Sequence, residues 1–244
     1  MRSILITGAN RGIGLELIRK IVTEKNPQHV FAGCRNINKA EVLQQFAASN
    51  STVRVLELDV TKDATVDAAV LQVSDIVGNE GLDVLINNAG IYNTEPLENT
   101  SRNMMQSYFN VNETGPLIIT QKFLPLLRQG SISHPASSLG GHNSVLNLTS
   151  GYGSIEGNTS GGIYSYRASK ATLNMITKSL SIDLRPDNIM AVALDPGWVQ
   201  TDMGGSFASS TTEECVKRLL QVIESLCEKE NGKIVSYKGN ILPF

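Results

Sequence analysis

The sequence has few cysteines and no long apolar run. Its three cysteines, Cys34, Cys215 and Cys227, include no CxxC pair and no cysteine–histidine cluster, which excludes a disulfide-rich scaffold and gives no sign of a metal site. We expect all three to be buried as small apolar groups. No stretch approaches the ~20 apolar residues of a membrane span, and the apolar run after Met1 is too short for a signal peptide. The expected location is therefore cytoplasmic.

Neither sign of charge prevails. Lysine and arginine number 21 against 23 acidic residues, for a formal net charge of −2. This balance gives no electrostatic reason to expect nucleic acid or an anionic membrane as a partner. With 41% hydrophobic and 18% charged residues, the 244-residue chain has the composition of a globular protein. Its length suits one large domain or two small ones.

Short apolar segments alternate with longer amphipathic ones. Strands are expected over residues 3–6, 30–34, 53–58, 83–87, 145–148, 189–194 and 234–237. Helical patterns cover residues 15–22, 41–48, 65–77, 104–128, 164–184 and 211–228. This alternation predicts a parallel sheet covered by helices on both faces. Because no repeat or linker divides the chain, residues 1–244 are expected to form a single domain.

Local features qualify two of these helices and mark two loops. Pro116 and Pro125 fall inside the long helix at 104–128, so a bend near either is an open alternative. Thr211 and Glu214 have the spacing of a capping box at the start of the last helix. Residues 129–144 and 151–162 are rich in Gly, Ser and Asn and are expected to be loops, which at this length are usually functional or mobile.

A glycine cluster follows the first expected strand. Gly8, Gly12 and Gly14 lie between that strand and a helix, where ligands of parallel sheets bind. Glycines let a backbone approach a pyrophosphate closely, and the helix start offers unpaired N–H groups to it. A simple turn is the alternative. The position between strand and helix favours a nucleotide site.

The end of the second strand indicates which nucleotide. A site for NAD normally has Asp or Glu there, but this chain has Arg35. An arginine suits the 2′-phosphate of NADP(H), and Arg11 in the glycine loop adds a second charge. The alternative is two ordinary solvated arginines. Asp59, after the third strand, either binds the adenine amino group or caps the next turn.

Candidate chemical groups follow the later strands. Tyr166 and Lys170 lie four residues apart on one face of a predicted helix, where an ammonium would lower the pKa of the phenol and make the pair an acid–base. A half-buried Tyr with a surface Lys is the alternative. Ser150 follows the fifth strand, where a hydroxyl can bond a substrate oxygen, and Thr149 is its rival. Pro196 and Gly197 follow the sixth strand and form either the nicotinamide end of the site or a simple turn.

In this order along almost the whole chain, these motifs resemble the short-chain dehydrogenases/reductases. Segments 3–7, 10–12, 153–159, 164–170 and 196–205 are most similar to the sniffer-type carbonyl reductases. The resemblance implies a single Rossmann-type, doubly wound parallel α/β sheet of about seven strands with helices on both faces. It also implies an NADP(H)-dependent carbonyl reductase that acts on an aldehyde, ketone or quinone. An alcohol or steroid dehydrogenase working oxidatively, and a non-catalytic NADP(H) sensor, stay open as alternatives.

The resemblance assigns roles to four residues. Tyr166 protonates the carbonyl oxygen, Lys170 lowers the pKa of Tyr166 and holds the nicotinamide ribose, and Ser150 orients the carbonyl. Asn112 supports a water that re-supplies protons to Lys170. The residues expected to bind NADP(H) are Gly8, Asn10, Arg11, Gly12, Ile13, Gly14, Arg35, Asp59, Val60, Asn88, Ala89, Gly90, Tyr166, Lys170, Pro196, Gly197, Val199 and Thr201.

The expected partners are a small carbonyl compound and further copies of the chain. Residues 93–97, 151–163 and 198–209 are expected to line the substrate pocket, and their apolar and aromatic side chains favour an apolar carbonyl compound. Relatives often pair through the helices that correspond to 104–128 and 164–184. A homodimer, a homotetramer and a monomer all remain open.

Overall fold

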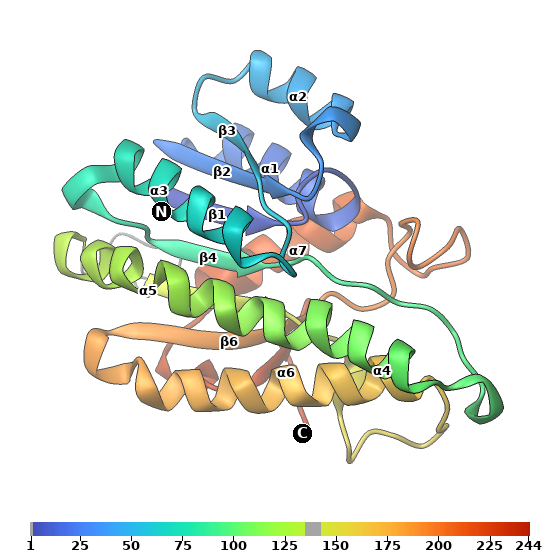
Figure 1. Ribbon diagram of the computed structural model, residues 1–244. Helices are drawn as coiled ribbons and strands as arrows, with labels where there is room; N and C mark the ends of the chain where they lie inside the picture. Colours follow the sequence, from blue (N-terminus) through green and yellow to red (C-terminus); the bar gives the residue numbers. More distant parts are fainter. Residues whose placement is uncertain (1, 135–142) are drawn as a thin grey trace.

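The computed structural model describes residues 2–134 and 143–244 (Figure 1). One sheet with the strand order β3-β2-β1-β4-β5-β6-β7-β8 runs through the molecule. Its strands are β1 (Ser3–Thr7), β2 (His29–Cys34), β3 (Val53–Glu57), β4 (Val84–Asn87), β5 (Asn143–Leu148), β6 (Ile189–Asp195), β7 (Ile234–Ser236) and β8 (Ile241–Leu242). The first seven pair in parallel, which confirms the predicted sheet, and β8 adds a short antiparallel edge.

Helices cover both faces of the sheet. On one face lie α1 (Gly12–Lys25), α2 (Glu41–Ala48) and α7 (Thr212–Ser225), and on the other lie α3 (Asp63–Val77), α4 (Arg102–Phe109), α5 (Gly115–Ser133) and α6 (Tyr164–Asp183). In Figure 1 the second group stands in front of the sheet, with α5 and α6 side by side. Since the central strands are buried on both faces, their sequences are apolar runs rather than alternating patterns.

The strand order reverses between β1 and β4. From β1 the chain builds outward through β2 and β3, and it then returns to the other side of β1 with β4. In such sheets a ligand binds beyond the carboxyl ends of the strands at the point of reversal. The segments that follow β1, β4, β5 and β6 therefore meet at one edge, and these segments carry the predicted site residues.

The long helix expected at 104–128 is interrupted by a π-helical turn. Helix α4 leads into this turn, Asn110–Thr114, and α5 begins directly after it. Pro116 supplies the physical reason, because it has no N–H to donate to the carbonyl of Asn112 one α-helical turn earlier. Instead, the N–H of Gly115 bonds to the carbonyl of Asn110, five residues back. Pro125 lies inside α5.

The loop expected at 129–144 is wrong at both ends. Helix α5 continues to Ser133, and β5 already begins at Asn143, while residues 135–142 lie outside the described part of the chain. The helix continues because Gly130 packs against the chain at Leu82, where an added Cβ would lie 2.4 Å from the Leu82 carbonyl oxygen. Tertiary packing therefore overrides the weak helix propensity of Gly and Ser here.

Of the expectations for the helix cap and the cysteines, some are confirmed and one is wrong. The capping box of Thr211 and Glu214 is confirmed, with both of its hydrogen bonds in place. Cys34 and Cys215 are buried as expected, but Cys227 is exposed, because it caps a short turn at the surface with a bond to Glu230. Among the residues that the structure describes, no helix is long and apolar enough to cross a bilayer.

Candidate active site

The glycine loop after β1 forms a close-fitting backbone cradle. Gly8 and Gly12 have φ angles of +64° and +54°, in the region that favours glycine. A Cβ on Gly14 would lie 2.5 Å from the Gly8 carbonyl oxygen and 2.5 Å from Nδ2 of Asn88. Helix α1 starts here with no side-chain cap on its first N–H groups. Free amides at a helix start and space for a close approach are what a pyrophosphate needs, so the loop fits a dinucleotide.

The other strand ends hold this cradle in place. Asn88, after β4, donates from Nδ2 to the carbonyls of Thr7 (2.8 Å) and Gly8 (3.1 Å). Ala89 lies so close to Gly8 that a Cβ added to Gly8 would be 2.9 Å from the Cα of Ala89. Thr201, from the segment after β6, lies against Gly12. Residues predicted to bind one cofactor therefore come together from three strand ends.

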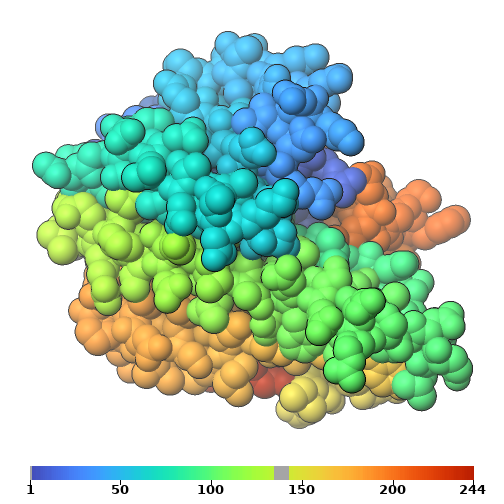
Figure 2. Space-filling view, viewed as in Figure 1, coloured from blue at the N-terminus to red at the C-terminus, as the bar shows by residue number. Residues whose placement is uncertain are grey.

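Two arginines stand at the outer end of this edge. Arg35 follows β2 and is exposed, while Arg11 is exposed at the start of α1. Arg11 donates to a carboxylate oxygen of Asp202 at 2.7 Å, which ties the glycine loop to the segment after β6. That segment projects beyond the neighbouring surface in Figure 2. Exposed guanidinium groups at the β2 end suit a phosphate on the adenine ribose.

For Asp59 the structure shows the simpler alternative. Its Oδ1 accepts from the backbone N–H of Thr61 at 3.0 Å and from the Thr61 hydroxyl at 2.8 Å, which closes a turn after β3. Val60 packs against Gly115 at the start of α5. Contact of either residue with a cofactor remains a prediction.

Tyr166 and Lys170 are both buried on the inner face of helix α6, which excludes the alternative of a surface lysine. Nζ of Lys170 lies 5.7 Å from the centre of the Tyr166 ring and donates to the Leu148 carbonyl at 2.7 Å. Burial lowers the pKa of Lys170 to about 8, while the Asp195 carboxylate raises it. At neutral pH the lysine is therefore still mostly an ammonium.

The predicted lowering of the pKa of Tyr166 is wrong in this structure. Burial raises the pKa of the Tyr166 phenol well above its usual value, and the charge on Asp195 raises it further. Only a hydrogen bond with Ser150 lowers it. The phenol is thus fully protonated at neutral pH, as a proton donor must be.

Ser150 is the hydroxyl that faces this pair. It follows β5, its oxygen accepts from the N–H of Tyr152 at 3.2 Å, and it bonds to Tyr166. Its rival, Thr149, is buried and donates to Oδ1 of Asn174 at 2.6 Å. Since Thr149 is committed to the packing of α6, Ser150 is the hydroxyl that bonds to Tyr166, and its contact with a substrate remains a prediction.

Asn112 is fully buried in the π-helical turn. Its Oδ1 accepts from the N–H of Ile91 at 2.8 Å, and its Nδ2 donates to the Ile91 carbonyl and to the Ser169 hydroxyl, both at 3.0 Å. Asn112 therefore anchors the segment after β4 to helix α6. π-Helical turns occur frequently at functional sites. Its support of a water for Lys170 remains a prediction.

Three aromatic rings that sequence reasoning did not connect surround Tyr166. The rings of Tyr92, Tyr108 and Tyr152 stand edge-on to it, with centroids 4.9, 6.5 and 6.5 Å away. The guanidinium of Arg167 lies 4.6 Å from the Tyr152 ring centre. This enclosure explains why the phenol is desolvated. Tyrosines after β4, on α4 and after Ser150 were visible in the sequence, but nothing local showed that they converge.

Glu95 is a further residue whose role the sequence did not reveal. It is buried, and its Oε1 accepts from the N–H of Ser165 at 2.7 Å, in the first turn of α6 and next to Tyr166. The residue before that helix, Ile163, has a φ of +50° and offers no capping side chain. A carboxylate from the segment after β4 therefore caps the helix that carries the proton donor.

We expect Glu95→Ala to lower the free energy of unfolding by about 1–3 kcal/mol, because it leaves the buried Ser165 N–H without an acceptor. The melting temperature should fall by about 2–4 °C for each kcal/mol. Thermal unfolding followed by circular dichroism measures the change. Glu95→Gln keeps an acceptor oxygen and is the control, so equal melting temperatures for Ala, Gln and wild type would contradict the capping role.

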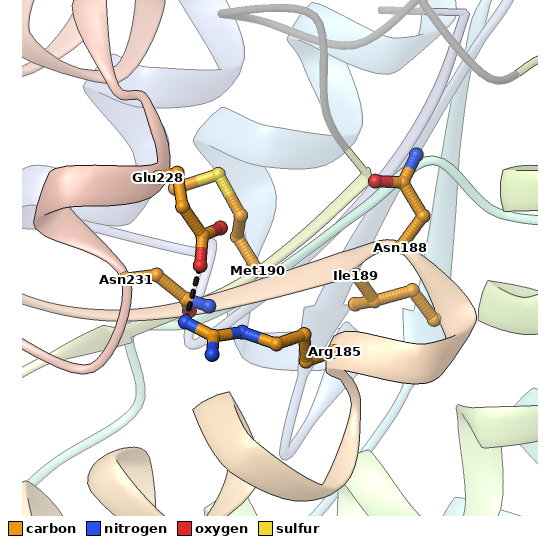
Figure 3. A pocket seen from close by; sticks show the side chains of 6 residues that line it. All are labelled: Arg185, Asn188, Ile189, Met190, Glu228 and Asn231. Atoms are coloured by element: carbon orange, nitrogen blue, oxygen red, sulfur yellow. Dashed lines mark hydrogen bonds and ion pairs between the residues drawn. The ribbon is translucent and has the colours of Figure 1, made fainter.

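The larger of two cavities described lies away from this site. About 380 Å³ in volume, it is lined by Arg185, Asn188, Ile189, Met190, Glu228 and Asn231 (Figure 3). Ile189 is the first residue of β6, so the cavity opens at the opposite edge of the sheet from Asp195. Arg185 forms an ion pair with Glu228 across it. Ile189 also pairs with Asn143, the first residue of the neighbouring strand β5.

Comparison with known proteins shows the family of the chain. A family profile described as short chain dehydrogenase matches residues 2–212, and the chain belongs to this family of oxidoreductases. The carbonyl reductase Sniffer of D. melanogaster is 39% identical, with a TM-score of 0.97 over 100% of both chains. An NADPH-bound carbonyl reductase from chicken fatty liver is 36% identical, with a TM-score of 0.95 over 100% of this chain and 99% of the other.

A third relative is the C-signal of Myxococcus xanthus. It is 42% identical over 164 residues, which make up 67% of this chain and 93% of that protein. The resemblance to short-chain dehydrogenases/reductases and to sniffer-type carbonyl reductases is therefore confirmed.

Proposed function

We propose that this protein is an NADPH-dependent carbonyl reductase. One observation carries the proposal: a buried, protonated Tyr166 bonds to Ser150 and lies beside the Lys170 ammonium, at the same sheet edge as the glycine cradle. A proton donor, an oxyanion partner and a dinucleotide cradle are the three parts that carbonyl reduction needs. Sequence identities of 39% and 36% to two carbonyl reductases over the full chain support the same activity.

Four residues of the chain have separate roles in the reaction. The substrate oxygen is held between Ser150 and Tyr166, and Tyr166 donates its phenolic proton to that oxygen as the carbonyl becomes an alcohol. NADPH, when bound, supplies the hydride that the carbonyl carbon receives. Lys170 holds positive charge near the phenol, so that the phenolate left behind is stabilised and re-protonated. Asn112 fixes the backbone on which these groups are arranged.

The protonation of Tyr166 supports reduction as the direction of the reaction. Reduction needs a proton donor, whereas oxidation of an alcohol needs a phenolate as base. Because burial raises the pKa of Tyr166, the protein holds the donor form at neutral pH. This favours reduction over the alternative of an alcohol or steroid dehydrogenase.

The test is oxidation of NADPH, followed by its absorbance, with a panel of aromatic aldehydes, diketones and quinones beside parallel assays with NADH. We expect turnover with NADPH and little with NADH. Tight binding of NADPH with no turnover across the panel would instead support the non-catalytic sensor.

The preference for NADPH should depend on Arg35 and Arg11. Each makes charge-assisted bonds to a 2′-phosphate, worth about 1.5–3 kcal/mol. We expect Arg35→Ala and Arg11→Ala each to raise the Kd for NADPH by about 10- to 100-fold while the Kd for NADH stays within twofold. Fluorescence titration measures both. Arg54→Ala, on the exposed side of β3, makes the same change in charge and should leave both constants unchanged. Equal weakening for NADH and NADPH would contradict this reading of the two arginines.

A further inference from the structure

The carboxylate of Asp195 lies within the active site. In the sequence, Asp195 is only the residue before the Pro196–Gly197 turn. Asp195 is the last residue of β6, directly before the segment expected to face the nicotinamide, and its charge acts on Lys170. It is partly buried, which makes it an unusual place for a negative charge. No step of the proposed carbonyl reduction involves Asp195.

The carboxylate joins two turns. Its Oδ1 accepts from the N–H of Gly197 at 3.1 Å, across the turn that follows β6. It also accepts from the N–H of Gly151, the residue after Ser150, and its Oδ2 lies 3.6 Å from the position of a Cβ on Gly151. The end of β5 and the end of β6 are thus fixed to one side chain.

We propose that Asp195 is a positioning residue of this site: its carboxylate fixes the Ser150 turn against the Gly197 turn and supplies the negative charge that keeps Lys170 an ammonium. The proposal rests on the proposed function, since it assigns the roles of Ser150 and Lys170 within it. Asn has the same shape and keeps one acceptor oxygen, so it retains one of the two hydrogen bonds while it removes the charge. The titration of Lys170 therefore reports the loss of the charge.

Groups from several elements face this carboxylate. On α6 these are the Lys170 ammonium, which favours the charged form of Asp195, and the Tyr166 phenol. On α7 the Cys215 thiol, which is buried, has its pKa raised to about 12 by burial and by Asp195. On the β7 side, the backbone N–H of Tyr237 donates to the backbone carbonyl of Asp195, not to its carboxylate, at 2.8 Å. Among these neighbours in the described chain, Lys170 is the cation.

The charge on Asp195 changes the pKa values of Lys170 and Tyr166 in the same direction. A carboxylate favours the ammonium form of Lys170 and the phenol form of Tyr166, so it raises the pKa of both groups. Both forms are the ones needed for reduction. Removing the charge should therefore lower both values and restrict reduction to lower pH.

The experiment follows the titration of Lys170 directly, by NMR of protein labelled with ¹³Cε-lysine. The Lys170 resonance is assigned by its absence in Lys170→Arg. In the wild type we expect a midpoint at about 8, and in Asp195→Asn a midpoint lower by about one pH unit. Asp75→Asn, exposed on α3, makes the same change in charge and should leave the midpoint unchanged. An unchanged midpoint in Asp195→Asn overturns the proposal.

A kinetic readout tests the same charge. For Asp195→Asn the decline of kcat/KM at high pH should begin at lower pH, while the KM for NADPH changes less than kcat. A lower kcat with an unchanged pH profile would show a purely structural residue. If Asp195→Asn does not fold, Asp195→Ser keeps a hydroxyl acceptor for Gly197 and replaces it.

The proposal and the function on which it rests fail differently. The titration needs no turnover, so absence of carbonyl reduction counts against the proposed function alone. A wild-type midpoint of Lys170 two or more units below 8 would overturn the role of Asp195 without any variant, because burial would then act unopposed.

Discussion

Tyr166→Phe is expected to lower kcat for carbonyl reduction by about 10²–10⁴-fold, the usual contribution of a positioned proton donor. The substitution removes the phenolic oxygen and its bond to Ser150 but keeps the ring, which stands among the rings of Tyr92, Tyr108 and Tyr152. Packing and the glycine cradle are therefore preserved. The Kd for NADPH should stay within about threefold of the wild-type value.

Steady-state kinetics and a fluorescence titration with NADPH measure the two quantities. Tyr164→Phe is the matched control, because it removes the same atom two residues earlier on helix α6, from a side chain that is 41% exposed. It should be as active as the wild type. Full activity in Tyr166→Phe would eliminate the proposed mechanism, whereas an equal loss in both variants would indicate a general effect on the helix.

Gly14→Ala is the second substitution with a large expected effect. The added methyl group would lie 2.5 Å from the Gly8 carbonyl oxygen, so the glycine loop must move away from the start of α1. We expect a loss of about 1–3 kcal/mol in the free energy of unfolding. NADPH binding should weaken by about 100-fold, equivalent to two charge-assisted bonds of about 1.5 kcal/mol each.

Denaturant unfolding and titration with NADPH measure these changes. Gly78→Ala is the control: Gly78 has a φ of +51°, with no atom within 4 Å of the added Cβ, and it lies at the far end of α3. It should cost stability without changing the affinity for NADPH. NADPH binding at wild-type affinity by Gly14→Ala would show that the cradle does not hold the cofactor.

The architecture could be predicted from the sequence because the information is local. Buried parallel strands are apolar runs, the helices between them are amphipathic, and their alternation leaves few topologies. Gly8, Gly12 and Gly14 were recognisable because they lie between a strand and a helix, where a positive φ requires glycine at Gly8 and Gly12 and close packing requires it at Gly14. Tyr166 and Lys170 were recognisable because helical spacing places them on one face.

What could not be predicted depends on contacts between distant segments. The cap that Glu95 provides to α6 spans 70 residues, and no local pattern indicates it. Asp195 looked like an ordinary residue before a Pro–Gly turn, since its hydrogen-bond partner Gly151 lies on another strand end. The raised pKa of Tyr166 arises from enclosure by rings of three separate segments, whereas sequence reasoning considered only its neighbour Lys170.

The π-helical turn at Asn110–Thr114 sets the rotation of helix α4 about its axis relative to helix α5. An α-helix advances about 100° per residue, so one residue fewer in this turn would rotate α4 by that angle relative to α5. Tyr108 would then turn away from Tyr166, and Asn112 away from Ile91. The number of residues in this turn therefore decides which side of α4 faces the active site while α5 stays packed on the sheet. An insertion or deletion in the turn would move Tyr108 out of the site even if every side chain were kept.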